Sequence, residues 1–447
     1  MDDKQGLLGK TKEELVEIIL ELEQRIKALE DKINGKLKDP PFFVKPNIHH
    51  YHHKPGQKDG HEGISRLSPV HIDETIEQTL SLCPDCHNPL GQSVEVIEHI
   101  QEDVIPAQAI ARKYRRHRYY CPCCKKIITA PYHENEVPQG RLGANVLIQT
   151  AILKYYHCLP YAKIAALFKE LCGLNVSPGA LAQSLQRISK WLRVEQKVIL
   201  EAIRGSPQVH ADETGWRMNG KNHWLWAFVN QRLAYYRVEP SRGRKIVKDT
   251  LTEEYNGTLI SDFYGVYFRL PYKMQKCLVH LLRELHDTAK RDNSKQYLAF
   301  YKQIKRIIDD AIRLKENKPD LIADIYQRRF ARIKQRLFLS LGSTGSTNKN
   351  ICRLAKRFSK FWLDMLTFLE VDNVDWNNNL AERMIRPNVI YRNRSFGNRS
   401  VAGAATHASL MSIIQTLRLR KENVFAFLKD AYLTHRQGNL LPLLSES

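Results

Sequence analysis

The sequence predicts a multidomain α/β protein whose largest domain is built around a mixed β-sheet. With 447 residues, of which 43% are hydrophobic, the chain is long and apolar enough for about three domains with cores of their own. From residue 207 to 262 the pattern changes from strand to hairpin to helix to strand, an order typical of an α/β unit. Residues 276 to 370 are then almost wholly helical in pattern, which predicts an all-helical insertion in that domain.

The strands of this domain are predicted from short apolar runs. PQVHAD leads up to an aspartate, HWLWAFVN and LAYYRVE alternate around a turn near Gln231, and GTLISD follows the helical run RGRKIVKDTL. Composition and turn residues separate the other parts of the chain. In order, the parts are a coiled-coil helix at 1 to 36, a basic Pro- and His-rich linker at 37 to 68, a zinc-ribbon-like domain at 69 to 135, a helical region at 136 to 205, the α/β domain at 206 to 433 and a tail at 434 to 447.

Two of the outer parts allow more than one interpretation. An apolar heptad seam predicts a helix that pairs two copies of the chain, although one amphipathic helix packed on its own protein would give the same pattern. Residues 136 to 205 contain helices joined by GLNVS, which fits a DNA-binding helix-turn-helix or ordinary helical packing. Gly173 is an expected helix end, and Ser177 with Pro178 an expected helix start. The seam consists of Leu15, Ile19, Leu22, Ile26, Leu29 and Ile33.

The charge of the chain indicates a polyanionic partner. A formal net charge of +21 and a pI of about 9.5 favour nucleic acid or a membrane surface and say nothing about fold. No run of about 18 apolar residues is present, so neither a membrane-spanning helix nor a membrane partner is expected. The N-terminal stretch lacks the apolar core of a signal peptide, and closely paired cysteines fit metal ligands better than disulfides. These features predict a cytoplasmic protein.

Four cysteines are spaced as two metal-binding knuckles. Cys83 and Cys86 form C-P-D-C, and Cys121 and Cys124 form C-P-C-C after a gap of 34 residues. Four thiolates of this spacing would close a tetrahedral, structural Zn²⁺ site and leave no position open for catalysis. The alternative is four unligated thiols.

Three acidic residues are the candidates for catalysis. Asp212 ends PQVHAD, Asp262 ends GTLISD, and Glu382 lies in WNNNLAERMIRP on a predicted helix. Carboxylates distant in sequence can converge and hold two divalent cations, which activate an attacking oxygen and stabilise a leaving one in phosphodiester chemistry. In such a site Asp212 would bridge both ions, and the other two acids would each bind one. The alternative is that each acid is a helix cap, a turn residue or part of a surface salt bridge.

Arginines near these motifs are candidates for DNA contacts. Arg383 and Arg386 follow Glu382, and Arg386 shares a helix face with it, where its guanidinium could clamp a phosphate. Ordinary surface ion pairs would use the same residues. The further DNA-binding candidates are Arg392, Arg394, Arg115 and Arg116.

Five stretches carry a specific pattern: HADETGW at 210 to 216, SDFYGVY at 261 to 267, CLVHLLREL at 277 to 285, NNNLAERMIRP at 377 to 387 and the tail at 392 to 428. Together they resemble the transposases of the insertion sequence 66 family. The double CxxC, the linker ending GHEG and the N-terminal helix are also similar. Val389 stands where many enzymes with this acidic triad carry a basic residue, which leaves the base beside Glu382 open.

The resemblance implies a DDE enzyme with an RNase H-like core and two Mg²⁺ (or Mn²⁺) ions. On the matching positions its catalytic acids are Asp212, Asp262 and Glu382, with His280 as an auxiliary residue. The implied reaction is cleavage at the ends of an insertion sequence and strand transfer into target DNA, by a homodimer or higher oligomer on terminal inverted repeats. Small accessory proteins and a place at the nucleoid of a prokaryote belong to the same expectation. The rivals are a nuclease without strand transfer and a non-catalytic, zinc-containing DNA-binding protein.

Overall fold

The computed structural model describes residues 11, 23, 69–93, 95–104, 107–138, 140–342, 346–436 and 444. The chain divides into two compact units, Met1–Asp103 and Val104–Ser447. The predicted coiled-coil helix and the linker lie almost entirely outside the described residues. In the described residues, no helix has the length and apolarity needed to cross a membrane.

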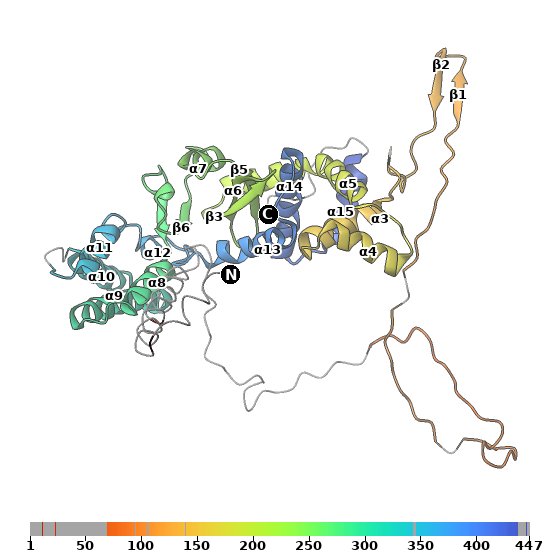
Figure 1. The fold of residues 1–447 in the computed structure, drawn as a ribbon, viewed down its shortest axis with the longest axis horizontal. Coiled ribbons are helices and arrows are strands. Elements are labelled where there is room, and N and C mark those ends of the chain that lie inside the picture. The colour runs from red at the N-terminus through yellow and green to blue at the C-terminus, as the bar shows by residue number, and fades with distance from the viewer. Residues whose placement is uncertain are drawn as a thin grey trace. The chain divides into compact units, whose positions relative to one another are not determined.

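The second unit contains a five-stranded mixed sheet (Figure 1). Its strands are β3 (Gln208–Met218), β4 (Lys221–Val229), β5 (Ala234–Glu239), β6 (Thr258–Ser261) and β7 (Lys273–Lys276), and α7 (Arg244–Leu251) lies between β5 and β6 in the chain. The strand order is β5-β4-β3-β6-β7. β3 is antiparallel to β4 and parallel to β6, so the predicted mixed sheet is confirmed.

One edge of this sheet is covered by a helix. α14 (Val401–Arg420) packs against β5 and is buried on nearly every side from Ala404 to Leu417. The backbone N–H of Ala234 donates to Thr416 Oγ1 (3.0 Å), and that of Tyr236 donates to Ser412 Oγ (2.9 Å). Hydroxyls of α14 therefore satisfy amides that an open edge strand would leave unpaired.

The helical region before the sheet is more broken than its pattern predicts. Gly173 ends a helix with φ 66°, and the Ser177 hydroxyl accepts from the Ala180 amide (3.2 Å), as expected. α3 continues directly into a π-helical turn, and the single residue Leu192 separates α5 from α6. The elements are α3 (Ala144–Ala151), the π-helical turn Ile152–Tyr156, α4 (Tyr161–Cys172), α5 (Pro178–Trp191) and α6 (Arg193–Arg204).

The helical insertion has its own hydrophobic cluster, which reaches the sheet through Ile260 and Phe263. Its expected start at residue 276 is corrected, because Lys276 is the last residue of β7 and the first helix begins at Leu278. The polar pattern KMQK hid this short buried strand. The insertion comprises α8 (Leu278–Ala289), α9 (Lys295–Glu316), α10 (Ala323–Leu341), α11 (Lys349–Phe358) and α12 (Thr367–Glu370); α13 (Asn379–Ser395), α14 and α15 (Val424–Arg436) follow (Figure 1).

His407 of α14 is fully buried, and its titration offers a test of this packing. Its Nε2 lies 2.8 Å from Asn388 Oδ1, and burial lowers its pKa from 6.5 to about 3, with the charge of Lys154 acting in the same direction. Above pH 6.5 the ring is neutral in both the folded and the unfolded state. As the pH falls from 6.5 toward about 3, the unfolded state binds a proton that the folded state does not, so the free energy of unfolding decreases. Three aromatic rings contact it, those of Tyr155, Trp216 and Tyr391.

Acidification from about pH 7 to about pH 5 is therefore expected to lower the free energy of unfolding by about 2 kcal/mol through His407 alone. Urea unfolding of wild-type protein and of His407→Gln at both pH values measures this component. His286→Gln, at an exposed position, is the control and should keep the full pH dependence. Equal pH dependence in wild type and His407→Gln would contradict the assignment.

Candidate active site

Asp212 and Asp262 lie at the same level of two adjacent parallel strands. The register pairs His210 of β3 with Ile260 of β6, and each aspartate comes two residues later. Because parallel strands advance in step, the two carboxylates come to neighbouring positions. Each is oriented by an amide: the Glu213 N–H donates to Asp212 Oδ1 (2.9 Å), and an N–H in the loop after β6 donates to Asp262 Oδ1 (2.9 Å).

Of the two strands, only β3 differs from the prediction. Asp262 directly follows β6, as expected, but Asp212 lies in the middle of β3. β3 continues to Met218 because it forms a second hairpin with β4 around Asn219 and Gly220. Asp212 therefore sits where β3 leaves its parallel neighbour and goes on with β4 alone.

Glu382 reaches this region from the first turn of α13. His280 Nε2, on the first turn of α8, lies 3.4 Å from Glu382 Oε1, so the structure brings together the third acid and the auxiliary histidine. The two helices start side by side because the Leu278 amide donates to Trp376 O (3.0 Å) just before α13 begins.

Asn378 fastens the start of α13 to β3. Its side chain is completely buried and does not cap its own helix. Its Nδ2 donates to Ala211 O (2.9 Å), its Oδ1 lies 3.1 Å from His210 Nδ1, and its backbone N–H donates to Cys277 Sγ (3.1 Å). His210 Nε2 lies 3.1 Å from Asp375 Oδ2, which closes the network. Sequence reasoning missed this role, because an asparagine before a helix normally indicates a cap.

The three acids interact electrostatically. Burial raises the pKa of Asp212 well above its ordinary value, and the charges of Glu213, Asp262 and Glu382 act in the same direction. A divalent cation would offset this repulsion, and carboxylate oxygens are the ligands that Mg²⁺ and Mn²⁺ prefer, so the donor set fits these ions. Among the described residues, no three His, Cys, Asp or Glu side chains are gathered closely enough to form a metal-binding group.

A fourth acid, Glu213, forms a hydrogen bond and an ion pair with residues outside the acidic triad. Its Oε2 accepts from the Tyr267 hydroxyl (2.5 Å), and its Oε1 pairs with Arg242 (2.7 Å). The Arg242 guanidinium lies over the rings of Trp224 (4.3 Å) and Tyr264 (3.8 Å). Successive side chains of a strand point to opposite faces of the sheet, so the adjacent residues Asp212 and Glu213 are expected on different faces from the sequence alone.

A buried lysine lies behind Asp262 and was also missed. Lys276 Nζ donates to Ser261 Oγ (2.9 Å) and to the backbone oxygen of Asp262 (3.1 Å). Burial lowers its pKa to about 8, although the charges of Asp262 and Asp364 act in the opposite direction. The ammonium group of Lys276 therefore lies next to the backbone that carries Asp262.

The arginines of α13 divide into two kinds. Arg383, Arg386 and Arg394 are exposed. Arg392 is half-buried, and its Nη1 donates to Thr214 Oγ1 (3.1 Å) and to Gly215 O, so this guanidinium holds α13 against β3.

Both cysteine knuckles show the same local geometry within their own units. In the first, the backbone N–H groups of Cys86 and Asp85 lower the pKa of Cys83. In the second, the N–H of Cys124 donates to Cys121 Sγ (3.4 Å) and lowers its pKa. Amide donors favour the thiolate, the form that binds metal.

The knuckles also share a turn that is unusual for their residue types. His87 follows the first CxxC with φ 57°, and Lys125 follows the second with φ 51°. The second turn joins β1 (Arg118–Cys121) to β2 (Lys126–Thr129). Just before it, Arg115 is exposed, and the Arg116 guanidinium stacks on the Tyr132 ring (3.7 Å).

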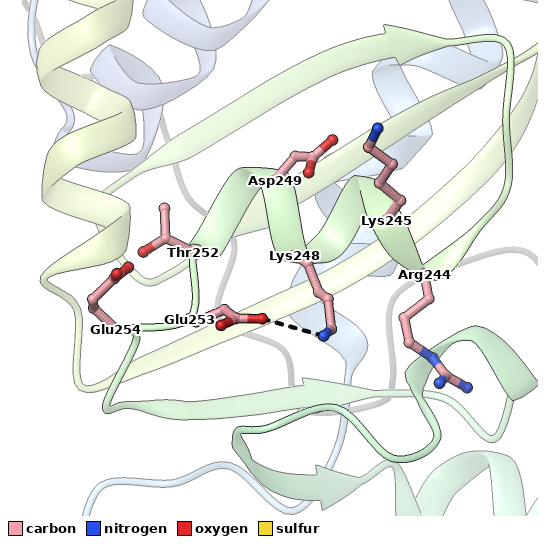
Figure 2. A pocket seen from close by; sticks show the side chains of 7 residues that line it. All are labelled: Arg244, Lys245, Lys248, Asp249, Thr252, Glu253 and Glu254. Atoms are coloured by element: carbon pink, nitrogen blue, oxygen red, sulfur yellow. Dashed lines mark hydrogen bonds and ion pairs between the residues drawn. The ribbon is translucent and has the colours of Figure 1, made fainter.

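A separate charged pocket lies at α7 and contains none of the predicted site residues. Figure 2 shows Lys248 turned toward Glu253, with which it pairs at 3.4 Å. The pocket has a volume of about 560 Å³. Its lining residues are Arg244, Lys245, Lys248, Asp249, Thr252, Glu253 and Glu254.

Comparison with known proteins identifies the family. Two similar proteins, both named as uncharacterized, come from Sinorhizobium fredii strain NGR234. The protein y4jD is 24% identical over 394 residues, which cover 81% of this chain and 76% of its own, and y4qI is 25% identical over 370 residues, which cover 75% and 67%. The model of the family described as "Transposase IS66 family" matches residues 139–406, more than half of the chain. The chain belongs to the IS66 family of transposases.

Proposed function

We propose that this protein cuts DNA at the ends of an insertion sequence and joins the freed ends to target DNA. The observation that carries the proposal is the level alignment of Asp212 and Asp262 on adjacent parallel strands, with Glu382 beside them on a helix anchored by Asn378. Family membership supports a transposase in general, and these residues supply the acidic triad that DNA cleavage and joining would need.

The proposed chemistry consists of two in-line displacements at one site. Asp212, Asp262 and Glu382 would hold two divalent cations, Mg²⁺ or Mn²⁺, which supply activation of the attacking oxygen and stabilisation of the leaving one. In the first step a water oxygen attacks phosphorus and the bond to the 3′ oxygen breaks, which leaves a 3′-hydroxyl. In the second step that hydroxyl attacks a target phosphodiester and displaces another 3′ oxygen. His280 would hold the Glu382 carboxylate in place.

The surrounding fold supports the same proposal. The order β5-β4-β3-β6-β7, with β3 antiparallel to β4 and parallel to β6, fits an RNase H-like core. Exposed Arg383, Arg386 and Arg394 would contact DNA phosphates, so affinity for DNA should fall steeply with salt.

A strand-transfer assay tests the proposal. Purified full-length protein is incubated with Mg²⁺, labelled DNA carrying the element end and an unlabelled target plasmid. We expect both cleaved and joined products. Cleavage without joining would favour the nuclease, and binding without either product would favour the non-catalytic DNA-binding protein.

We further propose Zn²⁺ as the structural partner of both knuckles, through Cys83, Cys86, Cys121 and Cys124. The amide-to-sulfur contacts and the matching left-handed turns after each pair support it. Four thiolates leave no open coordination position, so this ion would support folding and not catalysis.

Cys83→Ser is expected to abolish stoichiometric zinc binding and to destabilise residues 69–135, because metal binding to such a site is part of its folding energy. Mass-spectrometric metal analysis after dialysis measures the first effect and limited proteolysis the second. Cys123→Ser, an exposed thiol inside the second knuckle, is the matched control and should retain zinc. Native protein without zinc would contradict the proposal.

A further inference from the structure

Phe396 is 81% exposed, more than any other Phe, Tyr or Trp in the part of the chain that the structure describes. It directly follows the last residue of α13, and its backbone lies in the left-handed region with φ 56°. Bulky residues rarely adopt this conformation, so neighbouring contacts must hold it in place.

Those contacts come from the β3–β4 hairpin. The Asn398 N–H donates to Arg217 O (2.9 Å), and the Trp216 Nε1–H donates to Asn398 Oδ1 (2.8 Å). Between Phe396 and Asn398, Gly397 passes so close to the hairpin that an added Cβ would lie 2.2 Å from Arg217 O. The ring is therefore presented by a fixed segment of backbone.

The chain segments on either side of this ring are rich in basic residues. Residues 383–421 contain eight Lys and Arg and no Asp or Glu, and residues 214–238 of the hairpin also lack acids. Arg217, Arg394 and Arg399 are exposed next to Phe396 in the chain or across the hairpin contact. An exposed ring on a fixed backbone, with exposed arginines in the adjoining segments, is suited to stack a nucleobase while the arginines contact phosphates.

We propose that Phe396 is a stacking platform for an unpaired base of the bound DNA end, an inference that rests on the proposed function. Phe396 directly follows α13, 14 residues after Glu382, and a helix advances roughly 21 Å over that length. The platform therefore lies at the other end of α13 from Glu382, so the base that it stacks is away from the cleavage point.

The test compares two labelled duplexes of the same element-end sequence, one blunt and one with a splayed, unpaired end, bound to full-length protein at fixed salt. Wild-type protein is expected to bind the splayed duplex more tightly. Phe396→Ala should lose roughly 5- to 100-fold in affinity for the splayed duplex and little for the blunt one, since base–aromatic stacking has that magnitude. Phe396→Trp should retain the preference, and so should Val401→Ala, which removes an exposed apolar side chain nearby.

A second readout is photo-crosslinking with 5-iododeoxyuridine placed along the unpaired strand. A crosslink mapped to Phe396 supports the proposal. Equal binding of both duplexes by wild-type protein, or an unchanged preference in Phe396→Ala, overturns the stacking role while leaving DNA binding intact. Failure of wild-type protein to bind either duplex overturns the proposed function itself.

Discussion

Replacing Asp212 with asparagine is expected to abolish both DNA cleavage and strand transfer. The substitution keeps the size of the side chain and the acceptor for the Glu213 amide, but removes the charge at the centre of the acidic site. We expect a loss of about 10³-fold or more, the upper end of the cost of removing one electrostatic stabiliser. Because Asp212 shares its surroundings with three other acids, removing its charge should leave folding intact or slightly improved.

The measurement is the rate of appearance of cleaved and joined products, with urea unfolding to check the fold. Asp249→Asn, the same substitution at an exposed position on α7, is the matched control and should retain activity. Full activity in Asp212→Asn would remove this residue from the proposed mechanism. Loss of activity with loss of folding would instead indicate a structural role.

Local patterns were sufficient to predict β4, β5 and β6 and the position of Asp262 at the end of β6. Alternation in HWLWAFVN and LAYYRVE marks β4 and β5, and the apolar run in GTLISD marks β6, because each strand buries at least one face in the same core. Ser177 and Gly173 were predicted from capping chemistry, which depends only on adjacent residues.

Long-range contacts account for what the patterns missed. Arg392, a candidate for DNA contact, also donates to Thr214 and Gly215, which are far away in sequence, and so holds α13 against β3. Lys276 belongs to a buried strand although its residue type usually marks a surface, because it donates to oxygens of Ser261 and Asp262. No periodicity in the chain encodes such partners, so these roles become visible only in the fold.

Asn378→Ala tests the network that positions Glu382. The substitution removes the donor to Ala211 O and the acceptor at His210 Nδ1, both in a fully buried setting. Leaving two buried polar groups unpaired is expected to lower the free energy of unfolding by about 3 kcal/mol. Glu382 lies one helical turn further on, so activity should fall about 10- to 100-fold, as when a group that orients a metal ligand is lost.

The control for this variant is its neighbour, Asn379→Ala. Asn379 is exposed at the first position of α13, so the same change there should affect stability and activity little. The discriminating readout is the Mg²⁺ concentration that gives half-maximal strand transfer. A misplaced Glu382 should raise that concentration for Asn378→Ala, whereas a purely structural defect would lower the active fraction without shifting it. If both variants require the same Mg²⁺ concentration, Asn378 stabilises the fold but does not position the third acid.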